Sequence, residues 1–205
     1  MTENTPRPGR PRDPAKDLAV LVAARQLLGE VGYQQTTISA IARRADVNAP
    51  AIYRRWPTRE ALLEEAVHGP GRHVLPEPTA DLRTDLATWT NIFLARAASP
   101  AARAGVPGLL ADATSDGDRA RLIALQDPVR KAFVERLDAA VDAGDIPGPV
   151  PATMLFELLA GATTVRGLIH GDDDADAFVD ELASSLYVLA RHSDEIPDAR
   201  GGDAR

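Results

Sequence analysis

Residues 36–56, TTISAIARRADVNAPAIYRRW, predict two short helices joined by a tight turn, and no other stretch constrains the fold as strongly. The first helix has one apolar face at helical spacing, formed by Ile38, Ile41, Ala42 and Ala45. Thr36 or Thr37 can cap its start, and Asn48 can cap the second helix. Pro50 lies in the first turn of that helix, where its missing N–H costs nothing. The stretch therefore predicts a helix-turn-helix unit.

The outward face of the second helix carries an unusual set of side chains, namely Ala49, Pro50, Tyr53, Arg54 and Arg55, whereas Ile52 and Trp56 point inward. One interpretation is an ordinary helical hairpin with a solvated polar face. The other is a helix that enters the DNA major groove. No acidic residue occurs in residues 48–59, and a solvated face rarely exposes tyrosine and proline together, which favours the second interpretation.

A longer segment, about residues 15–67, resembles the DNA-binding region of the TetR family of bacterial repressors. The resemblance rests, in order, on Gly32-Tyr33, Thr36-Thr37, Ile41-Ala42, Val47, Ile52-Tyr53 and residues 58–63. The chain departs from the family pattern at Asp46, where glycine is usual, and at Asn48, Ala49 and Arg55-Trp56. Aspartate tolerates left-handed backbone better than most residues, so we expect the turn to be kept.

The resemblance implies a homodimeric transcriptional regulator that binds double-stranded operator DNA. Repression is the usual role in the family, and activation remains open. The residues expected nearest the base edges are Asn48, Ala49, Pro50 and Tyr53. Those expected to hold phosphates are Thr37, Ser39, Arg43, Arg54, Arg55 and Arg59.

Residues 1–13 form a basic, proline-rich arm, with Arg7-Pro8-Gly9-Arg10-Pro11-Arg12 at its centre. One interpretation is a flexible, solvated tail. The other follows from a resemblance to the AT-hook: Arg10 and Arg12 reach into the minor groove beside the main site.

Charge is distributed unevenly along an acidic chain with a net charge of −7. Residues 1–59 hold 10 basic and 5 acidic side chains, and residues 60–205 hold 13 basic and 25 acidic ones. A basic head and an acidic body indicate that only the head contacts DNA.

The remaining pattern predicts an all-α fold of about nine helices. We expect a three-helix helix-turn-helix DNA-binding domain over residues 14–69, an effector-binding and dimerisation domain over residues 70–193, and a disordered tail over residues 194–205. In the body, the pattern predicts helices over residues 79–98, 118–143, 152–170 and 175–192. Prolines and glycines in residues 100–115 leave only a short helix near residues 109–114.

The helix expected over residues 152–170 is apolar around most of its circumference, so it must be buried on more than one side. One interpretation is that this helix and the last one form the core of a monomer. The other, which the family resemblance implies, is a two-fold interface of four helices. The interface residues would be Leu155, Leu158, Gly161, Val165, Phe178, Leu182, Leu186 and Leu189.

The second half also resembles the ligand-sensing domains of this family, through residues 109–116, 144–151 and 166–171. The resemblance implies a pocket for an unknown small-molecule effector. Its walls would be Trp89, Phe93, Leu110, Phe133, Leu137, Phe156, Leu159 and Thr163, with Arg166 as a charged anchor. For each apolar wall residue a plain core position is favoured over a ligand contact, and Arg166 is equally a candidate for the dimer interface or for pairing with a neighbouring acid.

Other function classes receive little support. The chain has no cysteine, so thiol nucleophiles, disulfides and thiolate metal sites are excluded. No phosphate-binding loop or catalytic motif occurs, and we expect no cofactor and no enzyme activity. His170 with residues 172–174 is either a hard-metal site or a solvated loop, and the loop is favoured. Without a signal peptide or a long apolar run, we expect a cytoplasmic protein with no membrane partner. The competing hypothesis is a small helical metal- or ligand-binding enzyme with no DNA role.

Overall fold

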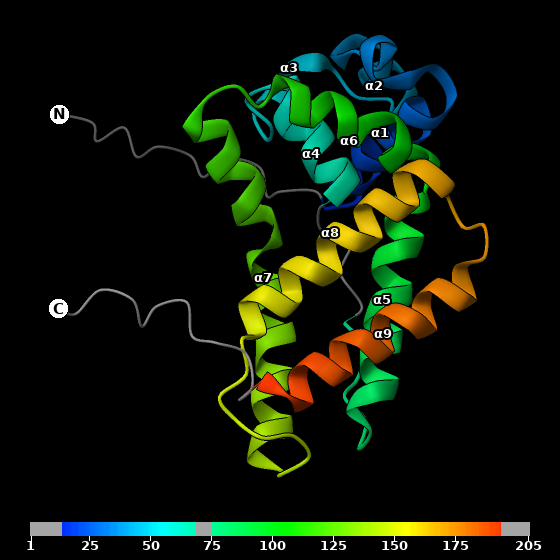
Figure 1. The fold of residues 1–205 in the computed structure, drawn as a ribbon. Coiled ribbons are helices and arrows are strands. Elements are labelled where there is room, and N and C mark those ends of the chain that lie inside the picture. The colour runs from blue at the N-terminus through cyan, green and yellow to red at the C-terminus, as the bar shows by residue number, and fades with distance from the viewer. Residues whose placement is uncertain (1–13, 69–74, 194–205) are drawn as a thin grey trace, which may run out of the picture.

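A computed structural model describes residues 14–68 and 75–193 (Figure 1). This part of the chain folds into nine α-helices and no strand, which confirms the all-α prediction. In chain order the helices are α1 (Pro14–Gln35), α2 (Ile38–Arg44), α3 (Ala49–Tyr53), α4 (Arg59–His68), α5 (Leu82–Ala98), α6 (Pro100–Asp112), α7 (Asp116–Asp142), α8 (Ala152–His170) and α9 (Ala175–Arg191).

Local capping bonds set the helices of the head, α1–α4. The Thr37 hydroxyl accepts from the Ala40 N–H at 3.2 Å, and Asn48 Oδ1 accepts from the Ala51 N–H at 2.9 Å. Thr58 caps α4 in the same way, at 3.1 Å from the Ala61 N–H. Between α2 and α3, Asp46 has φ 52°, so it takes the left-handed conformation that the missing glycine would otherwise supply.

Helix α6 completes the core of the head, although it lies far along the chain (Figure 1). Its buried residues Ala101, Ala102, Val106 and Leu109 pack with the apolar side chains of α1, α2 and α4. The head is therefore not a closed three-helix unit, because its core extends into the second half of the sequence.

The prediction of only a short helix near residues 109–114 is wrong, because α6 begins nine residues earlier, at Pro100. Ser99 caps the helix by accepting from the Ala102 N–H at 3.2 Å, so Pro100 is a helix start and not a break. Pro107 lies inside α6 and removes one backbone hydrogen bond. Burial of Val106 and Leu109 on either side offsets that loss.

The body is built from α5, α7, α8 and α9, and both α8 and α9 cross α5 (Figure 1). Four aromatic rings lie at its centre. Trp89 packs edge-on against Phe133 with centroids 5.4 Å apart, and Phe93 packs edge-on against Phe156 at 5.8 Å. Such edge-to-face pairs add to the stabilisation from area burial alone.

One polar contact ties the head to the body, and a second ties α1 to α6. Glu64 of α4, only 2% exposed, accepts two hydrogen bonds from the Arg121 guanidinium of α7, at 2.6 and 2.8 Å. The Tyr33 hydroxyl at the end of α1 donates to Asp112 of α6 at 2.6 Å. Burial, reinforced by this bond to Asp112, raises the pKa of Tyr33 to about 12. The hydroxyl thus stays protonated and remains a donor.

Helix α8 is long and apolar enough, by length and composition, to cross a membrane, and it is the one such helix in the described part of the chain. Its inward face packs against α5, α7 and α9 in the body. The approach to α5 depends on Gly167, because a Cβ at that position would lie 2.6 Å from the Ala97 Cβ and 2.7 Å from the Ala98 nitrogen.

Replacing Gly167 by alanine should therefore force α8 away from α5. We expect a loss of about 1–3 kcal/mol in the free energy of unfolding, the usual cost of overpacking, measured by urea denaturation. Gly117→Ala is the matched control, because its added Cβ would meet only the Ser115 Oγ at 3.7 Å. Equal unfolding free energies for the two variants would contradict the close approach at Gly167.

Candidate functional site

The outer surface of α2 and α3 is polar and basic at one end of the molecule (Figure 1). Ile38, Ile41 and Ile52 are turned into the head and are at most 7% exposed. Besides Arg44 and Asp46, the exposed residues include Thr37, Ser39, Arg43, Asn48, Pro50, Tyr53, Arg54 and Arg55. This surface thus gathers eight of the ten DNA contacts that the sequence predicts within the described residues.

Tyr53 is the most prominent apolar group on this surface, with half of its area exposed, at the last residue of α3. Ala49 is partly buried and packs against the head core, so only part of its surface faces outward. Asn48 uses its side-chain oxygen in the helix cap. Any contact from Asn48 to a base would therefore come from its amide N–H groups.

Ion pairs fix two of the arginines near this surface. Arg44 pairs with Glu30 at 2.6 Å, and Arg55 pairs with Asp17 at 3.3 Å, so both join α1 to the helix-turn-helix unit. The guanidinium of Arg55 also lies 5.9 Å from the centre of the Trp56 ring. Both pairs are exposed, so their net contribution to stability is small and their main effect is on side-chain orientation.

Arg59 is turned largely toward the head, and its predicted phosphate contact stays a prediction. Its Nε donates to the Thr36 carbonyl at 2.9 Å, and its Nη2 donates to the Tyr33 carbonyl. The guanidinium lies 4.3 Å from the centre of the Tyr33 ring, and the side chain is 22% exposed. Helix α1 departs from helical geometry at Gly32, which has φ 77°. Arg59 binds one carbonyl just after this break, that of Tyr33, and one between α1 and α2, that of Thr36.

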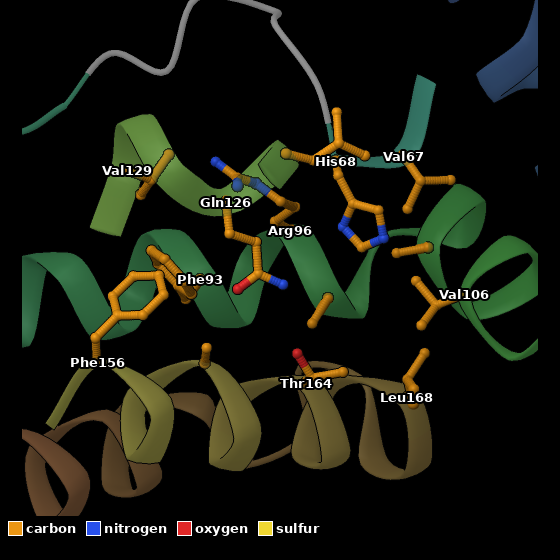
Figure 2. Close-up of a pocket in the computed structure, with 14 residues that line it drawn as sticks. Val67, His68, Phe93, Arg96, Val106, Gln126, Val129, Phe156, Thr164 and Leu168 are labelled. Carbon is orange, nitrogen blue, oxygen red and sulfur yellow. The ribbon is translucent and has the colours of Figure 1, made fainter. Parts of the chain in front are cut away.

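A second candidate site is a cavity, partly open to solvent, where the end of α4 meets α5, α6, α7 and α8 (Figure 2). Apolar side chains gather at both ends of the view, with Phe93, Val129 and Phe156 at one end and Val67, Val106 and Leu168 at the other. His68, Arg96, Gln126 and Thr164 lie between them.

Most of the predicted pocket walls lie elsewhere. Phe93 and Phe156 line the cavity. Trp89, Phe133, Leu137, Leu159 and Thr163 are buried core residues outside it. The Thr163 hydroxyl donates a hydrogen bond to the Leu159 carbonyl at 2.6 Å. Leu110 is 59% exposed on the outer face of α6, so it is not a wall.

Arg166 does not line this cavity either, so the structure gives no support to its predicted role as the anchor. Its Nη2 donates to the Asp173 carbonyl at 2.5 Å, and its guanidinium lies 5.3 Å from the centre of the Phe178 ring. Arg166 therefore stabilises the connection between α8 and α9. As for a metal site in that connection, no group of three histidine or acidic side chains in the described ranges is placed to hold an ion.

Sequence reasoning missed the two basic side chains of the cavity. Arg96 belongs to α5 and lies 5.6 Å from the centre of the Phe93 ring, and burial lowers its pKa. His68 is the last residue of α4; burial and then the charge of Arg96 lower its pKa to about 4, so it is neutral at pH 7. The sequence does carry one signal for Arg96, because it is the single charged residue in the otherwise apolar run of residues 92–98.

The outer face of α8 is apolar and exposed along its whole length. Met154, Leu158, Val165 and Ile169 are 37–65% exposed, and a Cβ at Gly161 would meet nothing within 4 Å. On α9, Val188 is 55% exposed. Leu155 and Leu186 are at most 1% exposed and belong to the core of the body, so their predicted interface role is wrong. Phe178, Leu182 and Leu189 are partly buried.

Two family profiles match the chain, and together they span both the head and the body. Residues 20–66 match the profile described as "Bacterial regulatory proteins, tetR family", and residues 76–186 match "Tetracyclin repressor-like, C-terminal domain". The second match alone covers more than half of the chain.

The chain belongs to the TetR family of bacterial regulators.

Curated relatives of this TetR-family chain are similar over most of their length. The uncharacterised HTH-type transcriptional regulator Rv1556 of Mycobacterium tuberculosis is 27% identical over 190 residues, which cover 84% of this chain and 90% of the relative. The DNA-binding transcriptional repressor TetR of Mycobacteroides abscessus is 29% identical over 185 residues, covering 88% and 96%.

Solved structures of TetR-family proteins share the fold. The regulator SCO0332 has a TM-score of 0.65 and 29% identity, covering 83% of this chain and 96% of that one. FadR from Bacillus subtilis, solved in complex with stearoyl-CoA, has a TM-score of 0.63 at 17% identity, covering 85% and 97%.

The family assignment makes this chain a DNA-binding transcriptional regulator with a helix-turn-helix head, in a family of regulators and not of enzymes. Arg10 and Arg12, predicted to contact the minor groove, lie outside the described residues. The contacts predicted for the α2–α3 surface and the wall roles of Phe93 and Phe156 stay predictions.

Arg59 provides a direct test of the inward placement. Arg59→Met should lower the free energy of unfolding by about 2 kcal/mol, because it removes charge-assisted hydrogen bonds to two backbone carbonyls. Arg54→Met, on the exposed surface, should change it by less than about 0.5 kcal/mol. Urea denaturation of both variants makes the comparison. If Arg59→Met has the unfolding free energy of the wild type but binds DNA more weakly, the inward bonds are contradicted and the predicted phosphate contact is supported.

Proposed function

We propose that this chain is a homodimeric transcriptional repressor that binds a two-fold operator and is released from it by a small-molecule effector, in the bacterial cytoplasm where the DNA lies. The observation that carries the proposal is the α2–α3 surface. Its apolar side chains are turned inward, and Tyr53, Arg43 and Arg54 are left exposed together at one end of the molecule.

DNA binding through this surface follows from its chemistry. An α-helix fits the major groove, where residues near its N-terminus reach base edges. In α3 those residues are Asn48, Ala49 and Pro50, with Tyr53 one turn further. Thr37 and Ser39 begin α2 and carry hydroxyls suited to phosphate oxygens, while Arg43, Arg54 and Arg55 supply charge.

A homodimer is supported by the exposed apolar stripe of α8. Met154, Leu158, Gly161, Val165 and Ile169 follow one another at helical spacing and are left open by the subunit itself. Val188 of α9 is also an exposed apolar side chain. A two-fold contact through α8 and α9 would cover these side chains. It would also present two heads to half-sites about 34 Å apart or a multiple of that distance.

Effector release is supported by where the cavity lies. Val67 and His68 close α4, the last helix of the head, and they line the cavity together with side chains of α5–α8. A molecule bound there contacts head and body at once. If it prefers one arrangement of the two, it changes DNA affinity by its difference in affinity for the two arrangements.

Tyr53→Ala and Arg54→Ala test the DNA-binding surface. The first should weaken operator binding about tenfold or more without changing the unfolding temperature, because the side chain is half exposed. The second should weaken all sequences alike and lower the slope of log Kd against log salt by about one. Fluorescence anisotropy with the DNA flanking the encoding gene gives both quantities. The control is Arg119→Ala, which removes an exposed arginine of α7 and should leave DNA binding unchanged. Unchanged DNA binding by both Tyr53→Ala and Arg54→Ala would contradict the proposed DNA-binding surface.

Val165→Glu tests the dimer. A carboxylate at the centre of the stripe would be buried without a partner in the interface, so light scattering should show a monomer at micromolar concentration. Leu110→Glu is the matched control, because Leu110 is 59% exposed against 58% for Val165 but lies on α6. A dimer that survives Val165→Glu, or a wild type that is already monomeric, would exclude this interface.

A further inference from the structure

Half of the arginines on the α2–α3 surface are already paired with carboxylates of α1. Residues 36–56 contain four arginines. Arg44 Nη1 lies 2.6 Å from a Glu30 carboxylate oxygen. Arg55 Nε lies 3.3 Å from an Asp17 carboxylate oxygen. Each of these two guanidiniums must leave its carboxylate, or share itself with it, before it binds a phosphate.

The other two arginines are in a different position. Arg43 and Arg54 are exposed, and neither forms an ion pair within residues 14–68 and 75–193. Their charge can therefore meet a phosphate without the loss of such a partner. The surface thus offers DNA less positive charge than its four arginines suggest.

Helix α1 holds both carboxylates in fixed places. Its buried face packs against α2, α4 and α6 in the core of the head. Asp17 lies in the first turn of α1, where the helix dipole favours a negative charge, and Glu30 lies in its second half. One carboxylate therefore meets the end of α2 and the other meets the residues that follow α3. The arginines are the partners that can move.

Both ion pairs are open to solvent, so each is weak by itself. Their four side chains are 35–53% exposed. A weak pair still matters for DNA of arbitrary sequence, because that binding depends almost entirely on how many cations reach phosphates and release counterions. A two-fold dimer would contain each pair twice, which doubles its effect on the binding free energy.

We propose that Asp17 and Glu30 restrain binding to DNA of arbitrary sequence, because each carboxylate competes with phosphate for an arginine of the α2–α3 surface. They are positioning residues, since each acts through the arginine that it holds. This inference rests on the proposed function, which takes the α2–α3 surface as the one that binds DNA. The restraint favours the operator, because non-operator sequence is present in large excess.

The test measures binding to a random-sequence DNA duplex. Asp17→Asn keeps the size of the side chain and one acceptor oxygen but removes the charge. Fluorescence anisotropy on the full chain should give a Kd about threefold or more below that of the wild type at low salt. The slope of log Kd against log salt should become steeper by about one for each subunit bound, because Arg55 gains a phosphate. Glu30→Gln should act in the same way through Arg44.

A double-mutant cycle assigns the gain to the arginine. Arg55→Met should weaken binding about threefold more strongly in the Asp17→Asn background than in the wild type, because only there is Arg55 released. The matched control is Asp46→Asn, which removes the same charge from the exposed turn between α2 and α3. Asparagine also tolerates the left-handed backbone of that position. Any effect of Asp46→Asn should be independent of Arg55, and circular dichroism checks that every variant folds.

Three outcomes would overturn the inference for the pair concerned. They are a Kd and a salt slope equal to those of the wild type, weaker binding after the carboxylate is neutralised, and an equal effect of the arginine substitution in both backgrounds. The wild type and the Tyr53→Ala and Arg54→Ala variants are measured beside them. A wild type that binds no DNA at low salt, or surface variants that bind as the wild type does, would contradict the proposed function itself.

Discussion

The packing of α6 against α1 and α4 is the contact on which the other features depend. Ala102 and Val106 belong to the core of the head and also line the cavity. Any molecule that changes the cavity therefore presses on side chains that hold the DNA-binding helices in place. Close-packed interiors transmit such displacements because they contain little free space. The head and the cavity share one wall, and no separate linker is needed to connect them.

Helix α4 has a polar contact near each end and one in its middle. Arg59 binds the Tyr33 and Thr36 carbonyls between α1 and α2, Glu64 pairs with Arg121 of α7, and His68 ends the helix beside Arg96. The apolar side chains between them, Leu62, Leu63 and Ala66, are buried. A helix of ten residues held in this way moves as one body. A shift at His68 must therefore be absorbed at Arg59 or at Glu64.

Local sequence signals predicted the parts of the structure that local physics decides. Capping residues predict the starts of α2 and α3 at Thr37 and Asn48 correctly, and apolar periodicity predicts the bounds of α8. These signals fail where the outcome depends on further partners. The prolines and glycines of residues 100–115 predict a break, whereas the Ser99 cap makes Pro100 a helix start. The bonds from Arg59 to the Tyr33 and Thr36 carbonyls cannot be foreseen from residue spacing.

Pocket walls were the least predictable feature for the same reason. Apolar periodicity predicts that Phe93, Phe133 and Leu159 face inward. It does not distinguish a residue that lines a cavity from one that packs against another side chain. Val106 and Leu110 share one face of α6 by their spacing of four residues, yet Val106 is buried and lines the cavity whereas Leu110 is exposed.

The distribution of the two tryptophans has a spectroscopic consequence. Trp56 lies in the core of the head with its indole N–H bonded to Glu65 at 2.6 Å, and Trp89 lies in the aromatic cluster of the body. The chain contains no other tryptophan. Each core thus carries a single intrinsic fluorophore, one with a hydrogen-bonded indole and one surrounded by phenyl rings. Emission from the two cores can be separated by replacing one tryptophan at a time, so the order in which they loosen is readable without any added label.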